Sequence, residues 1–364
     1  MRFLRVAVAA AFSAAAVVLP AGCGGSDGDG SGGSTVADRP APPASEFPSA
    51  KGKTLGQVLE TADGSAEEAG IVVSPASMVF EKGQNRYGFG VFSTGREQMT
   101  DAEVALYFAR VPPSESTVIP KGGAKEGESG SAQPPPENLA SALDQKATGP
   151  FPAAVESLET EPAFRAKTTT DDPDAALAVY TTTIDFPANG EWRVAALVND
   201  GGETRATLLP SAVVGQFGQV PQVGDRPPRV HTPTAEEVGG DLASIDTRLP
   251  PSTQHEQDFA DVLGKKPIVL LFATPQFCQS RVCGPVVDVT EQLKEEYGDE
   301  VTFIHMEIFN DNDPNKGARP QVRAFHLPSE PWVFVIDRAG VIRTAIEGAF
   351  GVNELDEAIQ GVTG

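Results

Sequence analysis

The feature that most constrains the fold of this chain is a continuous apolar run that leads to a pair of cysteines. Residues 267–273 read Pro-Ile-Val-Leu-Leu-Phe-Ala, as strands do when both faces of a parallel sheet are covered. Cys278 and Cys283 follow, and Pro285 suits the first turn of a helix. Apolar residues then recur at helical spacing along one face: Val286, Val289, Leu293 and Tyr297. The sequence therefore predicts a buried strand followed by a helix, with the two cysteines at the junction between them.

The rest of the C-terminal region continues this alternation of strands and helices. Its pattern predicts a strand at 301–309, a helix at 316–325, a hairpin of strands 332–337 and 341–346, and a helix at 352–362. This β-α-β then β-β-α order resembles the thioredoxin fold. Val223-Gly-Asp-Arg-Pro-Pro228 is similar to the opening of the redoxin branch of that superfamily. The resemblance implies an α/β thioredoxin-like domain over residues 252–364.

The resemblance also implies site residues. Phe277-Cys278, with a second cysteine entering a helix, resembles the active-site region of the superfamily, and Glu330-Pro331 precedes the third core strand, where the family keeps a cis-proline. On this basis Cys278 is the attacking thiol, Cys283 the resolving thiol, and Pro331 shapes an edge on which substrate backbone docks. The function implied is thiol–disulfide exchange on exported proteins, with no metal and no organic cofactor.

Four features depart from typical thioredoxins. Four residues separate Cys278 from Cys283 instead of two, and Phe277 stands where tryptophan is usual. The strand around Leu270 lacks the buried acid that assists proton transfer in thioredoxins. Glu330 precedes the proline, and an anion there disfavours a neighbouring thiolate. In the opposite direction, a helix N-terminus and the nearby Arg281 favour the thiolate.

Alternatives to redox catalysis remain open. The pair can be a structural disulfide in a non-catalytic binding or scaffold protein. A copper metallochaperone would pair soft thiolates with an imidazole, for which His305 and His326 are available. A peroxiredoxin would need threonine or serine at Pro275. We expect His231 and His255 to face solvent or lie near a helix cap.

The third cysteine belongs to a different feature, the N-terminal leader. Residues 1–22 read as a signal peptide, with Arg2 and Arg5 before an apolar stretch too short to span a membrane. Leu19-Pro-Ala-Gly-Cys23 resembles the lipobox of bacterial lipoproteins. That resemblance implies that Cys23 carries acyl chains of the palmitate type, which hold the protein at the extracytoplasmic face of the cell membrane.

Composition predicts three segments outside folded cores. Residues 23–66, rich in Gly, Ser, Pro and Ala, read as a disordered tether. Residues 112–148 read as a disordered insertion, because long structureless loops are rare inside compact domains. Residues 218–251 are Pro-rich and read as a linker.

Between tether and linker, residues 67–217 read as an all-β domain. Arg86 to Phe92 alternates at period two, Asn189-Gly190 marks a turn, and Asp200-Gly-Gly202 marks a hairpin. Short strands at this spacing indicate an antiparallel sandwich of immunoglobulin-like type. Phe186-Pro-Ala-Asn-Gly-Glu-Trp-Arg-Val194 resembles a late strand of small periplasmic Ig-like domains. The chain is thus expected to be multidomain, with this sandwich followed by the thioredoxin-like domain.

Charge narrows the possible partners. The 364 residues carry a formal charge of −22, which argues against nucleic acid and against anionic lipid head groups. The partners expected are protein thiols or disulfides, together with the membrane through the lipid on Cys23.

Overall fold

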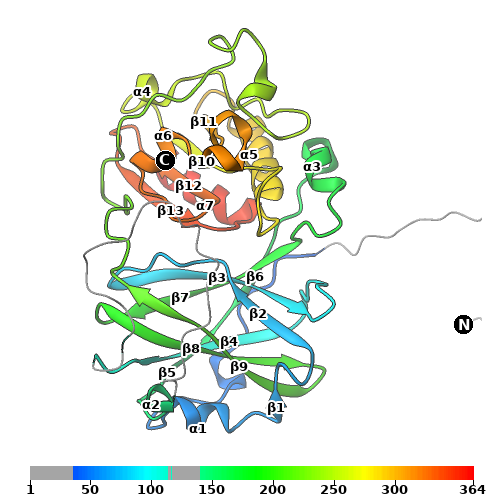
Figure 1. Ribbon diagram of the computed structural model, residues 1–364, viewed down its shortest axis with the longest axis vertical. Helices are drawn as coiled ribbons and strands as arrows, with labels where there is room; N and C mark the ends of the chain where they lie inside the picture. Colours follow the sequence, from blue (N-terminus) through cyan, green and yellow to red (C-terminus); the bar gives the residue numbers. More distant parts are fainter. Residues whose placement is uncertain (1–35, 114–115, 117–139) are drawn as a thin grey trace, which may run out of the picture. The chain divides into compact units, whose positions relative to one another are not determined.

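Three β-sheets organise the part of the chain that the computed structural model describes, residues 36–113, 116 and 140–364 (Figure 1). Residues 36–364 form one compact unit. The predicted signal peptide, Cys23 and most of the predicted insertion 112–148 lie outside the described residues. Within those residues, none of the helices is long and apolar enough to cross a bilayer.

Two of the sheets face one another as a sandwich. One has the order β2-β3-β7-β6, with β2 Ile71–Pro75, β3 Gly83–Ser93, β7 Ala178–Phe186 and β6 Ala154–Ser157. The other has the order β1-β9-β8-β4-β5, with β1 Gly64–Ser65, β9 Glu203–Val214, β8 Gly190–Asp200, β4 Glu103–Arg110 and β5 Thr148–Pro152. Both sheets contribute to a single apolar core.

The core of the sandwich follows the predicted period of two. Tyr87, Phe89 and Val91 of β3 are buried on one face, and the ring of Phe89 stacks on Tyr180 of β7 at 5.4 Å. Trp192 is buried and donates from its indole N–H to the carbonyl of Ala188 at 3.1 Å. The Phe89–Tyr180 contact joins two strands that lie about 90 residues apart in the chain, and these two residues are directly opposite one another in the sheet.

Residues 36–66 differ from the predicted tether. Phe47, Leu55 and Val58 are buried against the outer face of β4 and β8. Leu55 and Val58 lie on α1 (Leu55–Leu59), whose Thr54 and Gln57 form a reciprocal capping box. The physical reason is that β4 is apolar on both faces, so its outer face must also be covered.

The third sheet forms the C-terminal part of the unit. Its order is β11-β10-β12-β13, with β10 Ile268–Phe272, β11 Thr302–Met306, β12 Trp332–Ile336 and β13 Ile342–Glu347. β10 and β11 are parallel, whereas β12 is antiparallel to both β10 and β13. The predicted β-α-β then β-β-α order is therefore confirmed.

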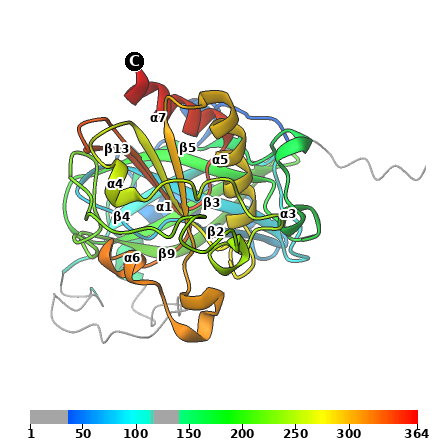
Figure 2. The ribbon, with the colours of Figure 1, turned by 90° about the horizontal axis from the view of Figure 1, so that it is seen from above.

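Helices cover both faces of this sheet. On one face α5 (Cys283–Tyr297) and α7 (Val352–Thr363) share a core with alternate residues of β10 and β12. These two helices lie side by side (Figure 2). On the other face lie the shorter α4 (Phe259–Val262) and α6 (Pro320–Ala324). Further helical turns lie in the connections: α2 Ala140–Leu143, α3 Lys167–Thr170, and 3₁₀ turns at Ala44–Glu46, Pro162–Phe164, Leu242–Ser244, Asn310–Asn312 and Pro314–Lys316.

The predicted linker is packed against the thioredoxin-like part. Asp246, Thr247 and Arg248 are buried. The Arg248 guanidinium donates to Asp288 of α5 at 3.0 Å, and the Thr247 hydroxyl donates to Glu307 at 2.8 Å. These hydrogen bonds offset the free-energy cost of removing the polar groups of this segment from water, because each charged group has a partner. We call residues 245–256 the strap.

The sandwich and the thioredoxin-like part touch through charged groups. Arg86 of β3 donates to Glu354 of α7 at 2.8 Å and to the carbonyl of Ala349 at 2.7 Å. Glu347, at the end of β13, accepts from the backbone N–H groups of Met78 and Val79, each at 2.9 Å. The two parts are therefore joined by directional contacts within the compact unit.

Candidate functional site

The two cysteines lie at the point where β10 passes into α5. Cys278 belongs to the turn after the strand, and Cys283 is the first residue of the helix. Both are free thiols in this structure. Cys278 is 6% exposed and Cys283 is 0% exposed, so the two sulfurs differ little in exposure and must be distinguished by their hydrogen bonds.

Backbone hydrogen bonds shape the loop that carries the thiols. The N–H groups of Phe277 and Cys278 both donate to the carbonyl of Thr274, at 3.2 and 3.1 Å. Arg281 has a φ of 60°, a left-handed conformation that turns the chain into α5. The four residues between the cysteines are thus accommodated by one tight turn and one left-handed residue.

The hydrogen bonds favour a thiolate on Cys278. The Cys283 thiol donates to the Cys278 sulfur and, together with the Ser280 hydroxyl and the backbone amides of Val282 and Cys283, lowers the pKa of Cys278 to about 6 despite burial. The Ser280 oxygen lies 3.2 Å from the Cys278 sulfur. Burial raises the pKa of Cys283 well above its ordinary value. The pair therefore holds one ready nucleophile and one protonated thiol.

The Glu330 carboxyl interacts with both thiols through its charge. The Glu330–Pro331 peptide bond is cis, as the thioredoxin resemblance predicts. Burial, followed by the charge of Cys278, raises the pKa of Glu330 to about 7. Glu330 in turn contributes to the raised pKa of Cys283. The predicted conflict between this carboxyl and the thiols is therefore present, and it is relieved by keeping Glu330 partly protonated near neutral pH.

Arg281 does not stabilise the Cys278 thiolate in the way that the sequence suggested. Its guanidinium donates to Asp172 at 3.0 Å, and its charge is not among the causes of the low pKa of Cys278. The carbonyl of Arg281 also accepts from the N–H of Ala176 at 3.1 Å. The residue instead ties the thiol loop to the connection between α3 and β7, through its guanidinium and its carbonyl.

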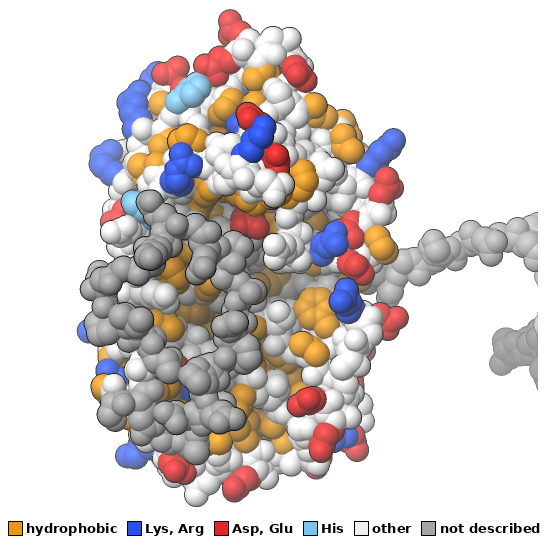
Figure 3. Space-filling view, in the orientation of Figure 1, with side chains coloured by type: hydrophobic (Ala, Val, Ile, Leu, Met, Phe, Trp, Pro, Cys, Tyr) orange, Lys and Arg blue, Asp and Glu red, His pale blue; other side chains and the backbone are white. Residues whose placement is uncertain are grey.

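A groove runs beside the thiol loop. It has a volume of about 600 Å³ and is lined by sandwich residues such as Val72, Ser74 and Phe92 on one side and by Gln279 to Val282 on the other. We call it the loop groove. On the face drawn in Figure 3, apolar side chains lie among acidic and basic ones. The groove thus places both apolar and polar side chains next to the loop that carries the nucleophile.

The structure corrects the prediction for one histidine and confirms it for another. His255 is buried and hydrogen-bonded to Asp246 at 3.0 Å, whereas we expected it near solvent. His231 is exposed and lies 2.9 Å from Asp258, the N-cap of α4, as expected. His326 is exposed. The sequence around His255 has no spacing typical of metal ligands. Only the polar composition of the strap indicated that this histidine has polar neighbours.

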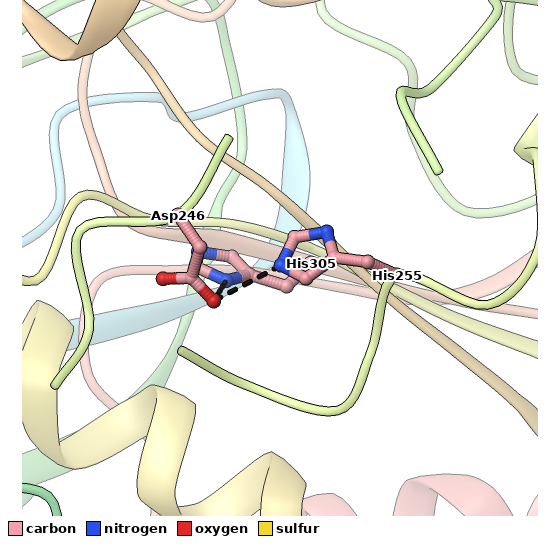
Figure 4. Close-up of side chains that lie close together, drawn as sticks. All are labelled: Asp246, His255 and His305. Carbon is pink, nitrogen blue, oxygen red and sulfur yellow. Dashed lines mark hydrogen bonds and ion pairs between the residues drawn. The ribbon is translucent and has the colours of Figure 1, made fainter. Parts of the chain in front are cut away.

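His305, Asp246 and His255 form a second cluster of side chains (Figure 4). Among the described residues, the only group of three or more ligand-type side chains is this one, and it contains neither cysteine. His305 donates from Nε2 to the carbonyl of Ala273 at 3.1 Å. The described residues therefore do not assemble the thiolate–imidazole set that a copper chaperone needs.

Comparison with known proteins yields limited likeness. No protein-family model matches the chain, and no curated protein matches it. Among solved structures, one from Chlorobium tepidum with the provisional name thiol:disulfide interchange protein DsbE is 15% identical, with a TM-score of 0.28, over 40% of this chain and 99% of that one. A thioredoxin family thiol:disulfide interchange protein from Chlorobium tepidum TLS is 17% identical, with a TM-score of 0.28, over 39% and 99%. The thioredoxin-like description of residues 268–363 therefore rests on their own strand order and connections.

Proposed function

We propose that this protein is a membrane-anchored, extracytoplasmic thiol–disulfide oxidoreductase that acts on exported proteins. The observation that carries the proposal is the difference between its two thiols. Hydrogen bonds lower the pKa of Cys278 to about 6, while burial raises that of Cys283. Exchange needs one thiolate to attack and a second, protected thiol to resolve, and a purely structural pair has no need of this asymmetry.

The first step uses Cys278. Its thiolate attacks one sulfur of a client disulfide, a mixed disulfide forms, and the other client sulfur leaves as a thiolate that takes up a proton. The Ser280 hydroxyl and the two backbone amides stabilise the thiolate before attack. Since the pKa lies below neutrality, most of Cys278 is ionised at pH 7.

The second step uses Cys283 and needs a base. Cys283 loses its proton and attacks the Cys278 sulfur, which forms the Cys278–Cys283 disulfide and releases the second client thiolate. Two electrons have then passed from the pair to the client, and the reverse sequence oxidises a client dithiol. Glu330, with a pKa of about 7 and a charge interaction with Cys283, supplies the proton acceptor that is missing near Leu270.

The sandwich contributes a client surface. Its strands β2-β3-β7-β6, facing β9-β8-β4, have the order of the A-B-E-D and G-F-C strands in immunoglobulin-like domains, with β1 and β5 added at the two edges of the second sheet. This order supports the Ig-like type. Its strands β2 and β3 line the loop groove opposite Gln279 to Val282. An extended client segment in this groove would lie against the redox loop on one side and the sandwich on the other.

The anchor follows from the leader sequence. Leu19-Pro-Ala-Gly-Cys23 supports lipid attachment at Cys23, and residues 24–35 leave a short stretch before the compact unit begins at Val36. Cys23→Ser is expected to release the protein from membranes, and the intact mass of the native protein is expected to include a diacylglyceryl group. Unmodified soluble native protein would contradict this part of the proposal.

The test of the exchange activity is covalent trapping. Cys283→Ser removes the resolving thiol, so mixed disulfides between Cys278 and clients should accumulate and be released by reductant. Cys278→Ser is the matched control and should trap far fewer, because Cys283 is buried and protonated. If neither variant traps a client and reduction of the native protein lowers only its thermal stability, the pair is a structural disulfide.

A further inference from the structure

The cluster of Asp246, His255 and His305 brings three strong metal ligands to one point. His255 Nε2 and His305 Nδ1 lie 3.0 and 3.3 Å from the same oxygen, Asp246 Oδ2. Figure 4 shows both imidazoles turned toward that carboxylate. All three side chains are at most 3% exposed. Asp246 and His255 come from the strap and His305 from β11, so the cluster joins two segments about 50 residues apart.

A fourth atom, the hydroxyl oxygen of Ser252, completes the arrangement. Ser252 Oγ lies 3.2 Å from His255 Nε2 and 3.3 Å from His305 Nδ1. Ligands bonded to Zn²⁺ at about 2.0–2.1 Å on the corners of a tetrahedron lie roughly 3.3 Å from one another. The four measured separations therefore have the length of tetrahedral edges, although they are also compatible with hydrogen bonds.

The surrounding contacts orient the ligands as metal sites require. His305 Nε2–H donates to the carbonyl of Ala273 at 3.1 Å, which leaves Nδ1 to face the cluster. The backbone N–H of Arg248 donates to Asp246 Oδ1 at 2.7 Å, and the backbone N–H of Ser252 donates to Oδ2 at 2.7 Å. These two contacts fix the carboxylate with Oδ2 toward the imidazoles. Such outer contacts set the tautomer and the ring orientation of ligating groups.

We propose that Asp246, His255 and His305, with Ser252 at the fourth corner, form a structural Zn²⁺ site. Two imidazoles and one carboxylate favour Zn²⁺ over Mg²⁺ or Ca²⁺, which prefer all-oxygen sites. The sequence alone predicted no metal. The burial of all four side chains indicates a closed site that acquires its ion during folding, unlike a catalytic site, which keeps an open position.

The site would pin the strap to the sheet behind the thiol loop. Ala273, whose carbonyl holds His305, is followed by Thr274, whose carbonyl accepts from the N–H of Cys278 at 3.1 Å. The Thr247 hydroxyl, next to Asp246, accepts from the N–H of Gln276 at 3.2 Å. The ion would thereby stabilise the turn that carries Cys278, without touching either thiol.

The experiment replaces all three cysteines, because thiolates also bind Zn²⁺. Protein with Cys23→Ser, Cys278→Ser and Cys283→Ser is unfolded with chelator, refolded with or without Zn²⁺, and dialysed before its zinc content is measured. We expect about one equivalent of Zn²⁺ per chain to be retained. We also expect the midpoint of thermal unfolding to rise on the order of 5 °C with Zn²⁺. Co²⁺ in place of Zn²⁺ should give the visible absorption of tetrahedral cobalt.

Two variants in the same background identify the ligands. Asp246→Asn keeps the size and a hydrogen-bond acceptor but loses the charge, and it should retain little Zn²⁺. His231→Gln, which changes an exposed histidine outside the cluster, should retain as much as its parent. The proposal is overturned if the parent refolds equally well without Zn²⁺ and retains almost none, or if Asp246→Asn retains the same amount as the parent. In either case the cluster is a buried ion pair.

Discussion

The Cys283 thiol donates a hydrogen bond to the Cys278 sulfur, and this contact is the largest cause of the low pKa of Cys278. The two residues of the pair thus have different chemistry before any client is bound. One is ionised at neutral pH, and the other is kept protonated by burial.

Cys283→Ala should raise the pKa of Cys278 from about 6 toward its ordinary value near 9.0, because the thiolate loses its main donor. The rate of alkylation by iodoacetamide rises with pH as the thiolate forms, so its midpoint should move upward by more than about one pH unit. Cys283→Ser retains a hydroxyl donor and should shift it less. Equal midpoints in all three proteins would contradict the hydrogen-bond account.

Glu330→Gln should slow the second step of exchange and leave the first almost unchanged. Because the pKa of Glu330 is about 7, its carboxyl is mostly protonated below pH 7, so alkylation of Cys278 there should change by less than about two-fold. Resolution of a mixed disulfide by Cys283 above pH 7 should slow at least several-fold, because its proton acceptor is gone. Glu300→Gln, at an exposed position, serves as the control. Resolution at the rate of the native protein would show that Glu330 is not a base.

Asp172→Asn should make the thiol loop easier to open. Asp172 accepts from Arg281 at 3.0 Å, and the Arg281 side chain is half exposed, so the pair contributes up to about 1 kcal/mol. Alkylation of Cys278 at a fixed pH above its pKa should therefore increase by up to about five-fold. Asp171→Asn, one residue away, is a suitable comparison. An unchanged rate would mean that the ion pair does not hold the loop.

Glu347→Ala should destabilise the compact unit as a whole. The buried Glu347 carboxylate accepts from two backbone N–H groups of the sandwich, those of Met78 and Val79, at 2.9 Å. Leaving both donors unpaired should cost about 2–4 kcal/mol in the free energy of unfolding, as measured by denaturant titration. A loss below about 0.5 kcal/mol would indicate that water replaces the carboxylate.

Much of the fold could be predicted from local patterns. The alternation in β3 and the apolar run in β10 are short-range signals that tertiary structure did not override. The segment 36–66 was read as a tether because Gly, Ser, Pro and Ala dominate its composition. Its capping box at Thr54 and Gln57 was the local signal of a packed helix.

The candidate site was predictable only in part. The positions of Cys278, Cys283 and Pro331 followed from the resemblance, whereas the ion pair of Arg281 with Asp172 depends on two segments about 110 residues apart. The grouping of Asp246, His255 and His305 was missed for the same reason. Its members come from an irregular strap and a distant strand, and no fixed spacing in the sequence marks such a contact.

The most direct test of the central claim is the reduction potential of the Cys278–Cys283 pair in the purified protein, measured by equilibration with glutathione. A stabilised Cys278 thiolate favours the dithiol form, so the account predicts a value between about −120 and −230 mV, the range of exchange catalysts. A potential below about −300 mV is typical of structural disulfides. That result would contradict the proposed oxidoreductase.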